Sequence, residues 1–324
     1  MTRFRLLLAV WLGLLGPPLA AAQPSTAIPR IGFLAASAPS PIGEAFRRGL
    51  RDLGYVEDRN VVIHARWADG RFDRLPDLAA ELVSLNADIM VTVGTQASLA
   101  ARQGAPMTPI VMVGADDPVG AGLTESLARP GRNVTGTSSI SGDTIGRALQ
   151  LLMEVAPGIT RVAALWNPVS LAFQTQLRRE AEAAAPGLGV QLQVLEVRNP
   201  NDLDRAFAAM VRQRAGALLV IPDPLFTFHR QRIVDLAARH RLPAMYGQRE
   251  WVEAGGLASY GANRAELARQ AATYVDRILK GALPAELPVE PPAKFDFIVN
   301  LKTAKTLSLR THASVLPHAD EIVE

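Results

Sequence analysis

The chain has 324 residues, 48% of them hydrophobic and 20% charged, which is the composition of a globular protein long enough for two domains with real cores. Its formal net charge is only +3 and its basic side chains are spread through several helices, which argues against a nucleic-acid-binding protein with a concentrated basic stripe. The chain has no cysteine, so we expect neither a disulfide nor a lipid anchor attached through cysteine.

Residues 1–22 have the features of a secretory signal peptide. Arg3 and Arg5 form a basic start, an apolar run follows, and residues 20–22 offer an A-x-A cleavage site. The apolar run is too short to span a bilayer comfortably, and a buried N-terminal helix is the alternative. We therefore expect cleavage after about Ala22 and export of the mature protein to a bacterial periplasm.

From residue 30 onward, short β-type runs alternate with helix-type segments. In the first half, strands are predicted at residues 31–35, 61–65, 89–93, 110–113 and 134–137, and helices at 43–54, 73–86 and 96–103. Alternation of this kind predicts a parallel sheet with helices on both faces.

The second half repeats the order of the first. Its strands are predicted at residues 162–166, 191–196, 217–221, 244–246 and 257–259, and its helices at 171–185, 203–214 and 229–240. Corresponding strands lie roughly 130 residues apart throughout, which indicates a structural unit built twice. We therefore predict an α/β fold of two Rossmann-like lobes, each a parallel sheet with helices on both faces.

The last part of the chain supplies elements that neither lobe accommodates in sequence order. Residues 262–281 are predicted as a helix that begins at the cap residue Asn263 and ends near Gly281. A proline-rich connector and one more strand and helix follow, so we expect several crossings that form a multi-strand hinge. The predicted division is an N-terminal lobe of residues 28–138 plus about 261–286, and a C-terminal lobe of residues 139–260 plus about 287–324.

Polar residues precede proline directly after three predicted strands, at Asp117, Asn167 and Asp223. Helix caps are the ordinary role of such residues, but ligands of open α/β sheets also bind at the carboxyl ends of strands and at helix N-termini. We expect the corresponding loops of both lobes to face one cleft, with Asp116 and Gln248 among their residues. The residues predicted to bind a ligand there are Ser37, Thr95, Gln96, Asp117, Thr137, Ser138, Asn167, Asp223, Tyr246 and Glu250.

These residue types fit the binding of a small solute. Hydroxyl and amide side chains can bind a carboxylate, and Asp223 or Glu250 could accept a charge-assisted hydrogen bond from an ammonium group. Four aromatic residues near the strand ends could stack on a ligand, although core packing is their commoner role: Trp166, Phe226, Tyr246 and Trp251. We expect no catalytic residue, no metal site and no cofactor, because the sequence has no nucleophile elbow, phosphate loop, dinucleotide fingerprint or metal-ligand spacing of histidines.

Several stretches together resemble the ABC-transporter substrate-binding family, in the branch of the type I periplasmic binding protein fold whose members bind tryptophan or tyrosine. The stretches are "GLRDLGYVEDRNVVIHARWADGRFDRLPDLAAELV" (49–83), "DPVGAGLTESLARPGRNVTG" (117–136), "FAAMVRQRAGALLVIPDPLF" (207–226), "AGGLASYG" (254–261) and "FDFIVNLKTAKTLSL" (295–309). The resemblance implies a monomeric, non-enzymatic receptor that closes on a small solute, such as an aromatic or other amino acid. It also implies delivery to an inner-membrane permease with a cytoplasmic ATPase. It places the residues of the Thr95 loop, Asp117, Ser138, Asn167, Asp223 and Tyr246 in the cleft.

Two other functions remain as alternatives at this point. One is a secreted sensory module that presents its closed state to a membrane receptor. The other is a secreted hydrolase that uses Asp117, Asp223 or Glu250 as acid and base.

Overall fold

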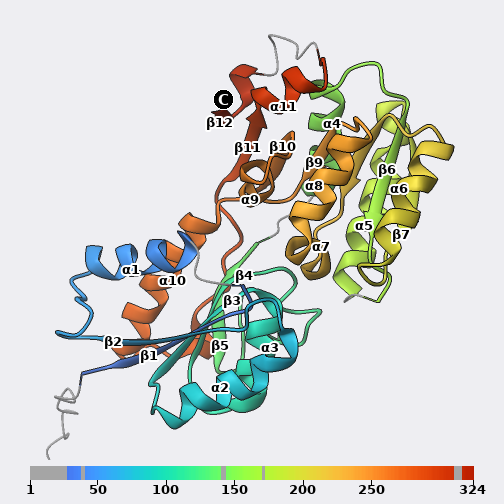
Figure 1. The fold of residues 1–324 in the computed structure, drawn as a ribbon. Coiled ribbons are helices and arrows are strands. Elements are labelled where there is room, and N and C mark those ends of the chain that lie inside the picture. Colours follow the sequence, from blue (N-terminus) through green and yellow to red (C-terminus); the bar gives the residue numbers. More distant parts are fainter. Residues whose placement is uncertain (1–27, 38–40, 140–143, 170–171, 310–315) are drawn as a thin grey trace, which may run out of the picture.

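The computed structural model describes residues 28–37, 41–139, 144–169, 172–309 and 316–324. The predicted signal peptide lies outside these residues. Two α/β lobes are joined by a narrow waist, with the first lobe below and the second above in Figure 1. Among the described residues, no helix has the length and apolar character needed to cross a membrane.

The first lobe is built on a five-stranded parallel sheet with the strand order β2-β1-β3-β4-β5. Its strands are β1 (Arg30–Ala35), β2 (Val62–Trp67), β3 (Ile89–Val93), β4 (Ile110–Ala115) and β5 (Val134–Ser138). Its helices are α1 (Pro41–Asp52), a 3₁₀ turn (Phe72–Arg74), α2 (Leu75–Ser84) and α3 (Gly94–Gly104). Strand β1 sends Ile31 and Phe33 toward α1 and Leu34 toward α2 and α3, so both faces of the sheet are buried.

The second lobe has a seven-stranded sheet with the order β12-β11-β10-β9-β8-β6-β7. Its strands are β6 (Arg161–Trp166), β7 (Gln191–Glu196), β8 (Ala217–Val220), β9 (Ala244–Tyr246), β10 (Ala258–Ala262), β11 (Phe295–Asn300) and β12 (Glu321–Val323). Read from β7, the first five strands of this sheet have the order found in the first lobe, which confirms the predicted repeat. A parallel sheet was predicted for this lobe, but strand β11 is antiparallel to β10, so the sheet is mixed. The reason is that β11 enters from the hinge after the chain has returned from the first lobe.

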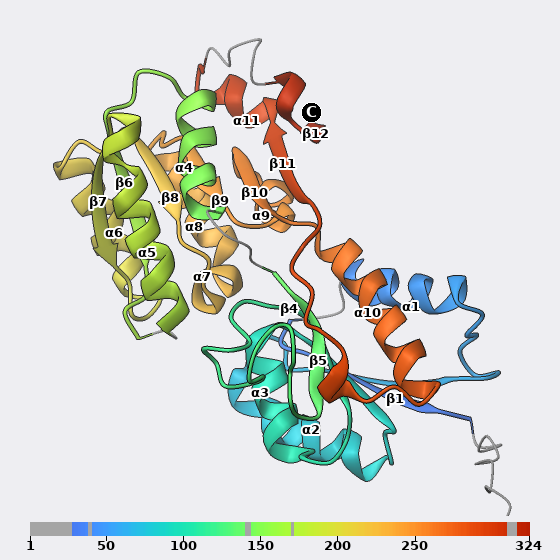
Figure 2. The ribbon, with the colours of Figure 1, turned by 180° about the vertical axis from the view of Figure 1, so that it is seen from behind.

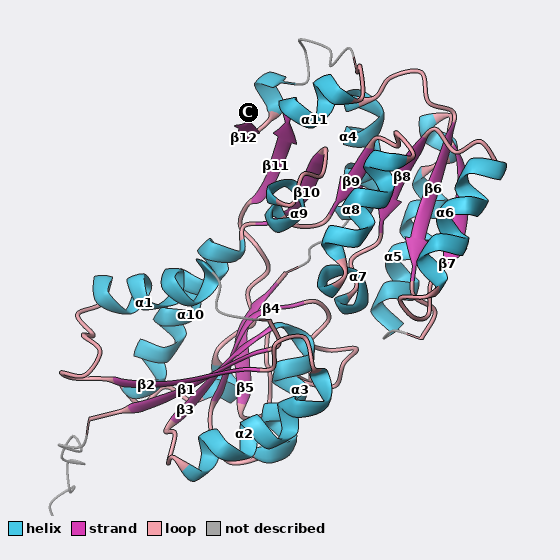
Figure 3. Ribbon diagram, in the orientation of Figure 1, coloured by secondary structure: helices cyan, strands magenta, loops and turns pink. Residues whose placement is uncertain are grey.

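Helices cover both faces of the second sheet (Figure 3). They are α4 (Thr144–Val155), α5 (Ala172–Ala184), α6 (Asp202–Arg212), α7 (Pro224–Phe228), α8 (Arg230–Arg239), α9 (Arg249–Glu253) and α11 (Leu301–Thr306), with 3₁₀ turns at Pro186–Leu188, Pro284–Glu286 and Leu316–His318. Helix α4 was not predicted, although Ile145, Ala148, Leu149 and Leu152 give it a clear apolar face.

The two lobes exchange helices. Helix α4 follows β5 of the first lobe and packs on α5 of the second, while α10 (Arg264–Leu279) follows β10 of the second lobe and packs on α1 of the first. The predicted cap of α10 is present, because the Asn263 side chain accepts a hydrogen bond from the Glu266 N–H. Each of these helices therefore begins at the waist of the molecule.

The chain crosses between the lobes after β5, after β10 and before β11 (Figure 2). Before the last crossing it runs beside β5, where Glu290 forms a bridge with Thr137 and accepts a hydrogen bond from the Ser138 N–H. The chain therefore stays on the first lobe through Glu290, a few residues past the change of lobe predicted at about 286. The two crossings near β10 and β11 are tied together by a hydrogen bond from Asn263 Nδ2 to Asp296 Oδ2 (2.7 Å).

Candidate functional site

A cleft with a volume of about 190 Å³ lies between the lobes and is lined from both. Segments that follow β1, β3, β4, β8 and β9 contribute to it, which is the arrangement expected at the carboxyl ends of parallel strands. The hinge contributes Tyr260, Gly261, Ala262, Arg264 and Phe295. The volume is below the roughly 300–1,000 Å³ of pockets for drug-sized ligands, so the cleft suits a small molecule.

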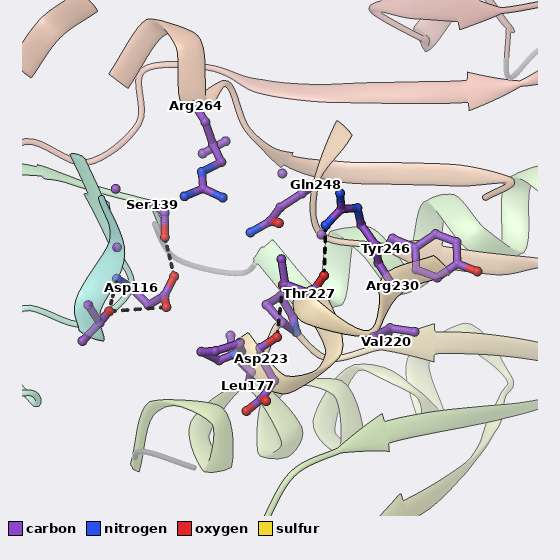
Figure 4. A pocket seen from close by; sticks show the side chains of 18 of the residues that line it. Asp116, Ser139, Leu177, Val220, Asp223, Thr227, Arg230, Tyr246, Gln248 and Arg264 are labelled. Atoms are coloured by element: carbon purple, nitrogen blue, oxygen red, sulfur yellow. Dashed lines mark hydrogen bonds between the residues drawn. The ribbon is translucent and has the colours of Figure 1, made fainter. Parts of the chain in front are cut away.

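Asp116 is the acidic residue that the first lobe brings to the cleft (Figure 4). The Ser139 hydroxyl donates to its Oδ1 (2.7 Å), and the Thr95 hydroxyl donates to its Oδ2 at 3.4 Å. Burial raises the pKa of the Asp116 carboxyl, and the negative charge of Asp223 on the other lobe raises it further. The Ser139 and Thr95 hydrogen bonds and the positive charge of Arg264 act in the opposite direction. Asp116 is thus a desolvated carboxylate for which a cationic partner would be favourable.

The predicted ligand residue Asp117 does not line the cleft. Its Oδ1 accepts a hydrogen bond from the Gly120 N–H (2.8 Å) and so closes a turn in the loop after β4. Adjacent residues in an extended segment point to opposite sides, and which of the two acids faces the cleft depends on the direction in which the chain leaves β4. Sequence reasoning could name the pair but could not choose between its members.

Asp223 comes from the second lobe and lines the cleft as predicted. It caps α7, because its Oδ1 accepts a hydrogen bond from the Leu225 N–H (2.8 Å). Asn167 lies behind it and donates from Nδ2 to the same oxygen at 3.4 Å, so Asn167 supports the site without lining it. The capping role and the position in the cleft therefore coexist in one side chain.

Two arginines line the cleft that the sequence did not single out, Arg264 and Arg230. Arg264 lies in the first turn of α10, and Figure 4 shows it reaching toward the space between Asp116 and Gln248. Within the described residues no hydrogen bond or ion pair engages its guanidinium group, whereas Arg230 donates to the Thr227 carbonyl oxygen (3.3 Å). The side-chain oxygen Oε1 of Gln248 is buried and has no hydrogen-bond partner in the described part of the chain.

The aromatic residues considered from the sequence pack in the core or on its edge. Tyr246 and Trp251 are buried and stacked with ring centroids 4.6 Å apart, and Figure 4 shows the Tyr246 ring directed away from Asp116 and Arg264. Phe226 is buried, and the Arg178 guanidinium lies over the Trp166 ring, 5.0 Å from its centroid. The aromatic residues among those that line the cleft are Phe72, Phe228, Tyr246, Tyr260 and Phe295.

The structure brings together half of the ten predicted ligand residues. Those lining the cleft are Ser37, Thr95, Gln96, Asp223 and Tyr246. Thr137 is instead buried within the first sheet, where its hydroxyl accepts from the Gly114 N–H (3.1 Å), and Ser138 pairs with the hinge segment through its backbone. Glu250 lies on α9 and does not line the cleft. Of the three carboxylates considered for hydrolysis, only Asp223 lines the cleft.

The protein has two α/β lobes of matching strand order, a cleft at their strand ends and several crossings between them. These features define the type I periplasmic binding protein fold. Within that class, the chain belongs to the family of ABC transporter substrate binding proteins, whose family model matches residues 32–323.

Solved structures and one curated relative are similar to this chain. A domain from Streptococcus pneumoniae, solved in complex with L-Trp, superposes with a TM-score of 0.83 at 24% identity and covers 92% of this chain and 100% of its own. A conserved domain protein from Vibrio cholerae gives 0.82 at 25% identity, with 91% and 100% covered. The "Tyrosine-binding protein" of Clostridioides difficile is 24% identical over 269 residues, which is 82% of this chain and 76% of the relative.

Proposed function

We propose that this protein captures a small zwitterionic solute, an amino acid, between its lobes and delivers it to an ABC permease in the inner membrane. It does so as a monomer in the periplasm, after removal of the predicted signal peptide, and without chemical change to the solute. The observation that carries the proposal is the placement around one cleft of two acidic side chains and of Arg264, whose guanidinium group forms no hydrogen bond or ion pair within the part of the chain that the structure describes.

The charges of the cleft match the two ends of an amino acid. The Arg264 guanidinium has the planar fork of donors that suits a carboxylate. Asp116 from one lobe and Asp223 from the other interact unfavourably across the cleft, and an ammonium group between them would relieve this repulsion. A solute held in this way contacts both lobes, so it favours the state in which the lobes are together.

The relatives support an amino acid as the solute. One structural neighbour was solved with L-Trp, and the curated relative is named for tyrosine. The apolar part of the cleft lining, which includes Val93, Leu219 and Phe295, is consistent with a solute that has an apolar side chain.

The test is isothermal titration calorimetry with a panel of L-amino acids and their methyl esters, on protein freed of bound solute. We expect Arg264→Gln to weaken binding of the free amino acid by roughly 10- to 150-fold, because a charge-assisted hydrogen bond contributes about 1.5–3 kcal/mol. The methyl ester, which lacks the carboxylate, should bind the wild type and Arg264→Gln with similar affinity.

Arg277→Gln is the matched control, because Arg277 is an exposed arginine at the other end of the same helix. It should bind the free amino acid as the wild type does. A wild-type protein that binds no amino acid, or that steadily converts one to a product, would remove the proposal. Stimulation of a co-reconstituted permease ATPase by the loaded protein would separate transport from a sensory role.

A further inference from the structure

The cleft is lined by charged and by apolar residues. The charged residues include Asp116, Asp223 and Arg264. The apolar lining includes residues that belong to the core of the second lobe or pack against it: Ile145, Ala148, Leu177, Leu219 and Tyr260. A solute whose charged groups contact the first set has apolar surface within the same cleft for its side chain.

Two stacked aromatic rings, Tyr260 and Phe295, line the cleft where it meets the hinge. They lie on the neighbouring antiparallel strands β10 and β11, in whose register Tyr260 pairs with Phe297 and Ala262 pairs with Phe295. Tyr260 and Phe295 are therefore diagonal neighbours on one face of the sheet, and their ring centroids are 5.6 Å apart with an angle of 24° between the planes. Both residues are half-buried, so part of each ring remains accessible.

The residue opposite Phe295 is small. Ala262 is the direct cross-strand partner of Phe295, and both line the cleft. A larger side chain at position 262 would compete for the space beside the Phe295 ring, whereas a methyl group leaves that space to a ligand. The sheet thus presents an aromatic pair beside a recess.

The pair is attached to the hinge itself. Residue 262 ends β10 directly before α10 crosses to the first lobe, and Phe295 begins β11 directly after the chain returns. Lys294, next to Phe295, forms ion pairs with Asp296 (3.3 Å) and Asp320 (2.8 Å), which join the crossing to the second lobe. A ligand group lying on the two rings therefore touches the segment that moves when the lobes open and close.

We propose that Tyr260 and Phe295 form the specificity-determining surface of the cleft and select amino acids with a planar aromatic side chain. This inference rests on the proposed function, since it assumes that an amino acid occupies the cleft. The ring of the solute packs as a third member of the stack, in an offset or edge-on geometry. Aromatic pairs of this kind are favourable beyond the apolar area that they bury, so a saturated ring of the same size gains less.

The test compares L-phenylalanine with L-cyclohexylalanine, whose ring has nearly the same size but no π system, by calorimetry on the purified protein. We expect the wild type to bind L-phenylalanine about five- to tenfold more tightly. In Phe295→Leu this ratio should fall to about twofold or less. Tyr260→Leu should act in the same direction and serves if Phe295→Leu does not fold.

Phe72→Leu is the matched control, because Phe72 also lines the cleft but comes from the first lobe and not from the hinge. It should keep the preference for the aromatic ring. If Phe72→Leu abolishes the preference and Phe295→Leu does not, the hinge pair is not the specificity surface. A wild type that binds amino acids without distinguishing the two rings overturns this inference alone. A wild type that binds none of them overturns the proposed function as well.

Discussion

Replacing Gly70 by alanine should weaken solute binding, because it obstructs a contact between the lobes. Gly70 belongs to the first lobe and lines the cleft, and its φ of +79° follows a φ of +51° at Asp69. A Cβ atom on Gly70 would lie 1.7 Å from Cε2 of Phe228, which belongs to the second lobe. Because carbon atoms in contact are roughly 3.5–4.0 Å apart, the ring would have to retreat by about 2 Å.

The substitution has two separable costs. Left-handed backbone at a residue with a Cβ costs about 1–2 kcal/mol whether or not the lobes meet, so it lowers thermal stability but not affinity. The overlap with Phe228 exists only when the lobes are in contact. If relieving it costs about 1–3 kcal/mol, as overpacking commonly does, the apparent Kd rises roughly 5- to 150-fold.

Calorimetry with L-tryptophan on Gly70→Ala, Phe228→Ala and the double variant distinguishes the two costs. We expect the double variant to bind as Phe228→Ala alone does, while the loss in Tm caused by Gly70→Ala persists in both backgrounds. Small-angle scattering should show that Gly70→Ala stays more open at a given solute concentration. The reasoning fails if Gly70→Ala binds like the wild type, or if it weakens binding equally with and without the Phe228 ring.

Three further predictions concern the acidic residues. Burial raises the pKa of Asp116 above its ordinary value of 3.8, so the unfolded chain ionises first and the folded state loses stability as the pH rises through and above that value. Asp116→Asn should therefore raise Tm relative to the wild type more at about pH 7 than at about pH 3, and an equal effect at both would contradict this. Asp223→Ala should weaken amino-acid binding and lower Tm, since it removes a cleft carboxylate and the cap of α7. Asp117→Ala should change the affinity by less than about twofold. A larger loss of affinity measured by calorimetry would show that Asp117 contributes to ligand binding.

Much of the fold could be predicted from the sequence because it depends on local patterns. Runs of apolar residues marked the strands, and the spacing of apolar residues marked most of the helices between them. The repetition of those patterns predicted two lobes with the same strand order, and Asn263 predicted the start of α10. These features need only neighbouring residues, or the comparison of one half of the chain with the other.

The sequence also indicated several of the loops that approach the cleft, but only the tertiary structure decided which side chains enter it. Asp116 faces the cleft and Asp117 does not, because the path of the chain after β4 orients them. Arg264 and Ile145 reach the cleft because α10 and α4 each cross from one lobe to the other at the waist, and Phe295 does so because β11 returns through the hinge beside β10. Positions of this kind are set by contacts between segments far apart in the chain, and local hydrophobic periodicity carries no information about them.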